Sequence, residues 1–202
     1  MQLHNSTYYP WLVFGVTAIG TFMATLDSSI LNVALPVIAA DFAVGLDTVQ
    51  WAVTAYLLAI CSLLLLFGRA GDIYGRRRVY ATGFVIFTLG SLLCGVASGI
   101  WLLVAARVIQ AVGASMLMAN AQGIVTATFT GPERGRALGL TSTMVGLGSL
   151  TGPGLGGLLI DAFGWRSVFF VNLPIGILGF MASKILPANR PAASERMDIP
   201  GA

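Results

Sequence analysis

Six long apolar stretches, separated by short polar segments, take up almost the whole chain. Each is close to the roughly 20 residues that a helix needs to cross the hydrocarbon core of a membrane. Pro36 is expected to end the first helix, because proline interrupts helical hydrogen bonding, and Asp47 with Gln50 is expected to cap the second. The pattern predicts membrane-spanning helices over 11–34, 49–67, 79–98, 101–126, 137–160 and 167–186.

Composition places the chain in the membrane class. Apolar residues make up 56% of it and charged residues 9%, whereas a soluble domain carries roughly 25% charged residues. The single histidine, His4, lies near the terminus, and no nucleophile–base pair, metal-ligand cluster or phosphate-binding glycine loop is present. The sequence therefore predicts an all-α, polytopic membrane protein that is not an enzyme and has neither a metal site nor a cofactor.

Two further features fit a retained membrane protein. Cys61 and Cys94 both lie inside apolar stretches, so we interpret them as packing residues rather than a disulfide or metal pair. No lysine or arginine precedes Trp11, so the N-terminus lacks the basic region of a cleaved signal peptide. The first stretch is therefore predicted to remain as a span.

The basic residues lie mostly on one side of the predicted membrane. Nine of the eleven lie at the end of the sixth stretch or after the second, fourth or sixth: Arg69, Arg76, Arg77, Arg78, Arg134, Arg136, Lys184, Arg190 and Arg196. Because basic loops stay in the cytoplasm, both termini are predicted to be cytoplasmic in a protein of the cell membrane. The net charge of +3 thus indicates topology rather than a nucleic-acid partner.

A glycine-punctuated string between the second and third stretches recurs 89 residues later. Its Asp72, Tyr74, Gly75, Arg77 and Val79 correspond to Asp161, Phe163, Gly164, Arg166 and Val168, and Gly68 corresponds to Gly157. The two strings are predicted at opposite membrane faces. That arrangement is typical of the inverted three-plus-three repeats of secondary transporters.

The first string is interpreted as a loop with a conformational role. Its arginines Arg76, Arg77 and Arg78 would hold anionic lipid head groups, and Asp72 would pair with them or cap a neighbouring helix. Such contacts could latch one conformation. The alternative is a pure topology signal, which would explain the arginines but not Gly68, Asp72 and Gly75.

Two ionisable residues, Asp27 and Arg107, lie inside the predicted membrane. At about 1.5 Å per residue, both lie roughly 9–11 Å from the outer edge, and each would be costly if it faced lipid. Asp27 is predicted to bind the proton and to face Arg107 across a central cavity. Arg107 would hold its charged form, adjust its protonation or receive an anionic substrate group. The alternative is a structural ion pair that only fixes helix register.

Gln110 lies one turn deeper than Arg107, on the same helix face. It would either hydrogen-bond a substrate or satisfy a helix interface.

The fifth stretch carries a run of small residues with one proline. Gly148, Gly152 and Gly156 recur every fourth residue, so they share one helix face that lets another helix approach closely. Pro153 should kink this helix, which would suit sliding or sealing against a partner half; ordinary small-residue packing is the alternative. The full pattern consists of Gly139, Gly148, Gly152, Pro153, Gly156 and Gly157.

These strings resemble the major facilitator superfamily over nearly the whole chain. Gly68-x3-Asp72-x2-Gly75-Arg76-Arg77-Arg78 is similar to its signature loop, with Ala70 in place of the usual leucine. Leu103-x3-Arg107-x2-Gln110-x2-Gly113 resembles its helix 4 motif, with Ala111 in place of the usual glycine. The string in the fifth stretch resembles the antiporter motif.

Two more strings resemble the multidrug branch with fourteen helices. Leu26-Asp27-x2-Ile30-x-Asn32 is similar to helix 1 of drug:proton antiporters, and Trp165-Arg166-x2-Phe169-x2-Asn172 to the start of helix 6. The resemblance implies proton-coupled efflux of drugs or other small amphipathic molecules, driven by the proton gradient without a cofactor. Asn32, Gln110 and Met116 are the candidates for its substrate cavity.

The resemblance also implies that residues 1–186 form the N-terminal, six-helix half of a longer fold. Residues 187–202 resemble a cytoplasmic lead-in to helix 7, truncated here. The expected partners are membrane lipids, a proton, a small-molecule substrate and a second six-helix half on the same or a separate chain. Export of an endogenous metabolite, or an inactive or partner-requiring half-transporter, remain alternatives.

Overall fold

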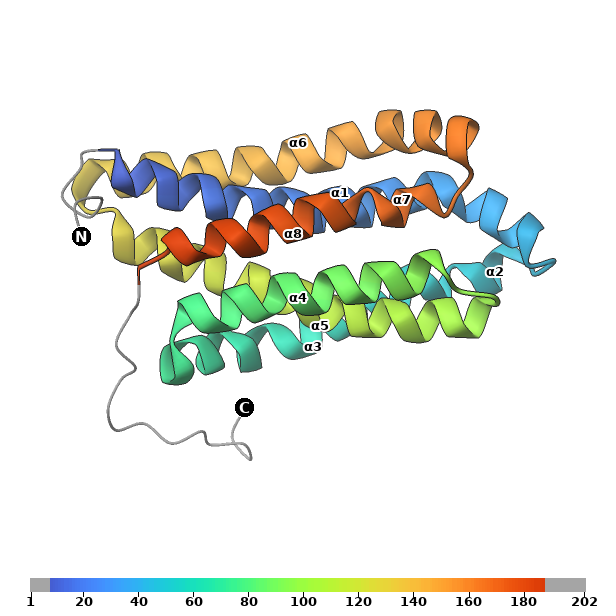
Figure 1. Cartoon of the computed structure of the whole chain (residues 1–202), viewed down its shortest axis with the longest axis horizontal. Coiled ribbons are helices and arrows are strands. Elements are labelled where there is room, and N and C mark those ends of the chain that lie inside the picture. Colours follow the sequence, from blue (N-terminus) through green and yellow to red (C-terminus); the bar gives the residue numbers. More distant parts are fainter. Residues whose placement is uncertain (1–7, 188–202) are drawn as a thin grey trace.

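The computed structural model describes residues 8–187, and the predicted tail therefore lies almost entirely outside the described residues. Six segments within them are long and apolar enough to cross a membrane. The elements are α1 (Tyr9–Asp41), α2 (Leu46–Val49), α3 (Trp51–Tyr74), α4 (Arg76–Gly95), α5 (Ile100–Thr128), α6 (Gly131–Phe163), α7 (Ser167–Phe170), α8 (Asn172–Ala182) and the 3₁₀ turn η2 (Ser183–Ile185). The prediction of an all-α, six-span bundle is confirmed (Figure 1).

Three predicted boundaries are wrong. Helix α1 continues through Pro36 to Asp41, because burial of Ile38 and Ala39 in the core outweighs one missing backbone hydrogen bond. Asp47 does not cap the second span: Gly45 is the N-cap residue, and Asp47 lies inside the first turn of α2.

The predicted loop over 68–78 is the third difference. Helix α3 runs through Gly68 and Asp72 to Tyr74, and the chain breaks only at Gly75, whose φ of 95° disfavours any other residue. The repeat-related Gly164 ends α6 with a φ of 78°. A glycine with positive φ therefore ends a helix at each end of the bundle, at equivalent positions of the two repeats.

The helices pack in a reciprocal pattern. In each repeat the first helix lies against the second helix of the other repeat: α1 packs along α6, and α5 packs along α3. Helix α4 also packs closely on α5, and α8 packs on α4 (Figure 1). This exchange is what the inverted repeat predicts.

Two apolar core clusters occupy the two ends of α1. Val13, Met23 and Ala24 belong to one, and Ile30 and Ile38 belong to the other. Asp27 lies between them in the sequence. A polar site in the middle of α1 is thus enclosed by apolar layers on both sides.

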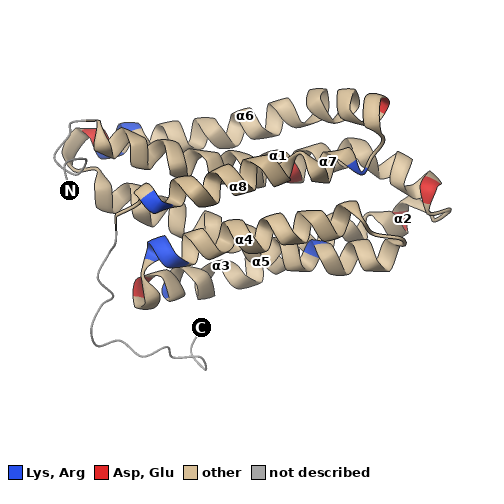
Figure 2. Ribbon diagram, viewed as in Figure 1, with Lys and Arg blue, Asp and Glu red and all other residues tan. Residues whose placement is uncertain are grey.

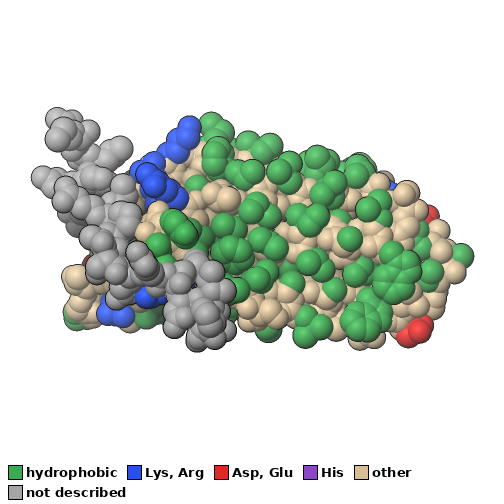
Figure 3. Space-filling model, turned by 90° about the horizontal axis from the view of Figure 1, so that it is seen from below, with side chains coloured by type: hydrophobic (Ala, Val, Ile, Leu, Met, Phe, Trp, Pro, Cys, Tyr) green, Lys and Arg blue, Asp and Glu red, His purple; other side chains and the backbone are tan. Residues whose placement is uncertain are grey.

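Charge is concentrated at the ends of the bundle (Figure 2). The starts of α4 and α6 and the turn η2 carry most of the basic residues at one end of the bundle, while apolar side chains dominate the surface between the ends in Figure 3. Helices α3 and α6 are the least covered, with 17% of their most apolar windows buried.

Candidate functional site

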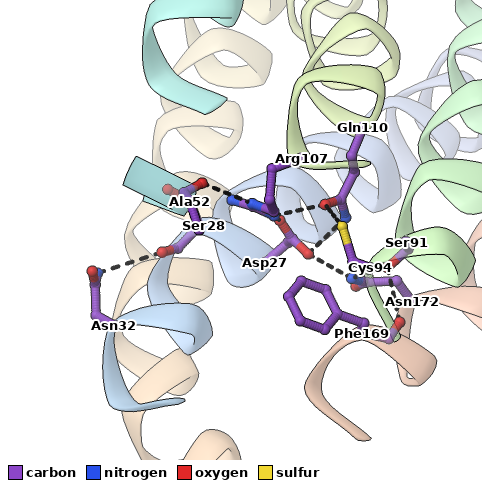
Figure 4. Close-up of polar contacts among 10 residues, drawn as sticks. All are labelled: Asp27, Ser28, Asn32, Ala52, Ser91, Cys94, Arg107, Gln110, Phe169 and Asn172. Carbon is purple, nitrogen blue, oxygen red and sulfur yellow. Dashed lines mark hydrogen bonds and ion pairs between the residues drawn. The ribbon is translucent and has the colours of Figure 1, made fainter. Parts of the chain in front are cut away.

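Asp27 of α1 and Arg107 of α5 meet inside the bundle, and neither side chain has solvent-exposed surface. Arg107 Nη1 donates to Asp27 Oδ2 at 2.5 Å. We predicted that the two charges would face one another across a cavity. In the structure they are instead in direct contact. Figure 4 shows the pair between α1 and α5, with polar groups from other helices around it.

Gln110 completes the contact on α5, one turn from Arg107. Its Nε2 donates to Asp27 Oδ1 at 2.8 Å, and its Oε1 accepts from Arg107 Nη1 at 2.7 Å. The Cys94 thiol donates to the same Oε1 at 3.6 Å. Both ends of this amide are thus occupied, which fixes its orientation.

Asn172 at the start of α8 is the site residue that the sequence did not place. Its Nδ2 donates to Asp27 Oδ1 at 2.7 Å and to Ser91 Oγ of α4 at 3.0 Å. Ser91 in turn donates to the Phe169 carbonyl at 2.9 Å. An asparagine in an apolar stretch was the available signal, but only the fold brings the start of α8 beside Asp27.

The guanidinium of Arg107 is held from a second side by α3. Its Cζ lies 3.8 Å from the centroid of the Tyr56 ring, within the range of a cation–π contact. Its Nε donates to the Ala52 carbonyl at 3.2 Å. Among the described residues, Arg107 Nη2, the Tyr56 hydroxyl and Asn172 Oδ1 are buried without a hydrogen-bond partner.

The two other candidates for a substrate cavity lie away from this site. Asn32 is exposed, and its amide donates only to the Ser28 carbonyl one turn back, at 3.4 Å. Met116 is buried with Ala70 and Val79 between α3, α4 and α5. Gln110 is the one member of that predicted set that contacts Asp27.

The signature string at the basic end forms a local ion pair. Arg76 donates to Asp72 Oδ1 from Nε at 3.0 Å and from Nη2 at 2.8 Å, so the pair joins the end of α3 to the start of α4 across the break at Gly75. Beside it, a surface groove of about 420 Å³ is lined by Gly68, Arg69 and Asp72 of α3 and by Gln122 of α5, among others. Arg77 and Arg78 follow Arg76 in the first turn of α4.

Asn120 of α5 anchors the end of α3, another contact that the sequence did not indicate. Its Nδ2 donates to the Phe67 carbonyl at 3.1 Å and to the Met116 carbonyl at 2.9 Å. Gly71 leaves room for this side chain, because a Cβ there would collide with the amide.

The glycine face of α6 packs against α1 rather than facing a missing partner. Cβ atoms on Gly148, Gly152 or Gly156 would collide with side chains of α1, so the small residues permit this close approach. Gly139 and Gly157 face open space instead. The face that we expected to slide or seal against a partner half is therefore covered by α1 within this half.

Pro153 lies within α6, which stays α-helical from Gly131 to Phe163. Proline has no N–H to donate to the carbonyl four residues earlier, here that of Ser149. Ser29 of α1 donates its hydroxyl to this carbonyl at 2.7 Å. The hydrogen bond that Pro153 removes is thus replaced by one between α6 and α1, two residues beyond Asp27.

Comparisons with known proteins agree with this architecture. The family model described as Major Facilitator Superfamily matches residues 17–198. The solved structure of the proton:xylose symporter XylE, which belongs to that superfamily, superposes with a TM-score of 0.80 over 90% of this chain and 46% of XylE, at 14% identity. That likeness shows the fold.

Curated relatives are closer in sequence. The riboflavin transporter RibZ of Clostridioides difficile (strain 630) is 47% identical over 95% of this chain and 42% of its own length. The multidrug resistance protein Stp of Mycobacterium tuberculosis (strain CDC 1551 / Oshkosh) is 45% identical over 80% of this chain and 30% of its own length. The cephamycin export protein CmcT of Amycolatopsis lactamdurans is 41% identical over 98% of this chain and 41% of its own length.

The chain thus spans less than half the length of these relatives. The family model nevertheless covers nearly all of it, including Asp27, Arg107 and both repeat-related strings. From this match and the fold together, the chain belongs to the Major Facilitator Superfamily of membrane transporters.

Proposed function

We propose that this chain supplies the proton-coupling half of an antiporter that exports small amphipathic molecules. The observation that carries the proposal is the Asp27–Arg107 pair, which is fully buried among α1, α3, α5 and α8. Burying two charges is costly, and ionisable residues inside a membrane bundle commonly mark proton and substrate pathways.

The pair provides a simple means of coupling. When Asp27 binds a proton from outside, its charge is lost and Arg107 keeps its own, so the ion pair no longer holds α1 to α5. A proton can drive a conformational change only if it binds the two states with different affinity, and breaking the pair supplies that difference. Release of the proton inside restores the pair as substrate leaves in the opposite direction.

The substrate class rests on the relatives and is the less specific part of the proposal. Their names include multidrug resistance, cephamycin export and riboflavin transport. Export of a metabolite made by the cell itself is the second candidate, and relatives such as the cephamycin export protein favour it. The proton gradient would drive either process without a cofactor.

A second six-helix half would complete the transporter, because the midplane site of such folds lies between two halves. Helices α3 and α6 are the least covered helices and are the natural contact surfaces. The basic end of the bundle would face the cytoplasm with both termini, in the cell membrane. A chain that is inactive until it meets this partner is the alternative to independent activity.

Transport in proteoliposomes tests the proposal. The chain is reconstituted alone and fused to the remaining helices of RibZ, its 47% identical relative. Riboflavin and a lipophilic cation are added in turn, and a pH-sensitive dye reports proton movement. Asp27→Asn removes the coupling charge, and Asp47→Asn makes the same change at an exposed carboxylate as the matched control.

Gradient-driven transport that is lost in Asp27→Asn and kept in Asp47→Asn supports proton-coupled antiport. Transport that survives Asp27→Asn contradicts the role of Asp27. Activity of the fusion but not of the chain alone identifies a partner-requiring half. If neither form moves protons with any probe, although both are folded, the inactive alternative is favoured.

A further inference from the structure

The Asp27 carboxylate accepts each of its described hydrogen bonds from a side-chain N–H group. Its Oδ2 accepts from Arg107 Nη1, and its Oδ1 accepts from Gln110 Nε2 at 2.8 Å and from Asn172 Nδ2 at 2.7 Å. Such a site suits a carboxylate. A protonated carboxyl group carries an O–H of its own, and a buried donor without an acceptor is unfavourable.

Two of the three partners cannot offer an acceptor. The guanidinium of Arg107 carries donors only. Gln110 has a carbonyl oxygen, but that atom already accepts from Arg107 Nη1 at 2.7 Å and from the Cys94 thiol. Inverting the Gln110 amide would place its NH₂ group against the guanidinium, donor against donor.

Asn172 is different, because its carbonyl oxygen is buried and has no hydrogen-bond partner among the described residues. A half turn about the last side-chain bond exchanges its nitrogen and oxygen. Oδ1 would then stand where Nδ2 stands now, beside Asp27 Oδ1 and 3.0 Å from Ser91 Oγ. Among the described residues, the Asn172 amide hydrogen-bonds only to Asp27 and Ser91, so no third partner holds it in its present orientation (Figure 4).

We propose that Asn172 inverts its side-chain amide when Asp27 binds a proton, and so accepts a hydrogen bond from the new carboxyl O–H. The inference rests on the proposed function, since it requires that Asp27 takes up a proton. Arg107 of α5, Tyr56 of α3 and Cys94 of α4 are the other charged or titratable groups around the site. Among the described hydrogen bonds, neither Tyr56 nor Cys94 contacts Asp27.

The inversion would also change the hydrogen bonds that connect Asn172 to α4 and α7. Ser91 now accepts from Asn172 and donates to the Phe169 carbonyl at 2.9 Å. Once the Asn172 oxygen faces it, the Ser91 hydroxyl turns its hydrogen to that oxygen and releases Phe169. Protonation of Asp27 thereby breaks a hydrogen bond between α4 and α7, at the junction where α8 begins.

Isotope-edited infrared spectroscopy tests this inversion in the whole chain reconstituted in lipid nanodiscs. The side-chain carbonyls of the five asparagines are labelled with ¹³C, and spectra at low pH minus high pH are recorded. The carboxylic acid band of Asp27, assigned by its absence in Asp27→Asn, reports protonation. The labelled carbonyl band of Asn172, assigned by its absence in Asn172→Gln, reports hydrogen bonding.

We expect both bands to change over the same pH range, with the Asn172 carbonyl moving to lower frequency as it gains a hydrogen bond. The shift should vanish in Asp27→Asn and persist in Ser91→Ala, which leaves the contact with Asp27 intact. An acid band at Asp27 without a shift at Asn172 overturns the inversion and leaves the proposed function standing. Absence of the acid band at every pH overturns both.

Discussion

Two Asp–Arg pairs in this chain have the same chemistry and opposite surroundings. Asp27 and Arg107 have no exposed side-chain surface, whereas Asp72 and Arg76 at the basic end are 42% and 28% exposed. The buried pair joins α1 to α5 and is surrounded by Gln110, Asn172 and Tyr56, whereas the exposed pair joins residues four positions apart across the helix break at Gly75. The same two side chains therefore form a buried ion pair between two helices in one place and a partly exposed ion pair beside a helix break in the other.

The difference follows from what water does at each place. Solvent screens the exposed pair and competes for its hydrogen bonds, so such pairs contribute about 0–1 kcal/mol. Protein groups must replace water around the buried pair, and an unmatched charge there is destabilising by several kcal/mol. The polar shell around Asp27 is thus a requirement of burial, while Asp72 needs none.

Removing one member of the buried pair should have the largest effect. Arg107→Leu leaves Asp27 buried without its counter-ion, and we expect the free energy of unfolding to fall by about 3–5 kcal/mol. Unfolding in mixed detergent, followed by circular dichroism, measures the change. Arg76→Leu is the matched variant of the exposed pair, with an expected loss below about 1 kcal/mol.

Neutralising the remaining charge should repair part of this loss. The double variant Asp27→Asn with Arg107→Leu carries no buried charge, so it should unfold less readily than Arg107→Leu alone. Equal losses for Arg107→Leu and Arg76→Leu would show that burial does not distinguish the pairs.

Widening the seam between α1 and α6 should disturb the buried pair without touching a charge. A Cβ on Gly152 would lie 2.6 Å from Ser29 Cβ, two residues beyond Asp27. We expect Gly152→Val to reduce the free energy of unfolding by about 1–3 kcal/mol, measured in the same way. Gly154 has open space around it, so Gly154→Val is the control, and a similar loss there would contradict specific packing at Gly152.

The helix break beside the exposed pair should matter through the backbone rather than through charge. Gly75 has a φ of 95°, and a side chain held in such a conformation costs about 1–3 kcal/mol. Gly75→Ala is therefore expected to destabilise the chain by about that amount in thermal unfolding. Gly139→Ala, in a helical position with open space, should be neutral or stabilising.

The sequence predicted the elements whose signals are local. Six apolar stretches gave the six spans, and the matching depths of Asp27 and Arg107 gave their proximity. The repeat of Gly75 at Gly164 gave the inverted relation between the two three-helix repeats. These features depend on length, depth and periodicity, which a single chain displays.

Contacts between distant segments could not be read in the same way. Asn172 reaches Asp27 from 145 positions away, and no spacing rule connects them. The glycines of the signature string suggested a loop, yet α3 stays helical there, and Gly71 instead makes room for Asn120 of α5. In both cases tertiary packing decides which interpretation of a small or polar residue holds.

The exposed pair itself should give the smallest effect, and its dependence on salt makes the test specific. Asp72→Asn removes one charge from a pair whose atoms lie 2.8 Å apart at the surface of the basic end. We expect the free energy of unfolding to fall by less than about 1 kcal/mol at low salt. The difference should shrink at high salt, because exposed charges are screened. Asp27→Asn should keep its effect across the same salt range, since the buried pair is shielded from ions. A salt-independent loss at Asp72 would mean that its contacts resemble those of the buried pair, and that exposure alone does not separate the two sites.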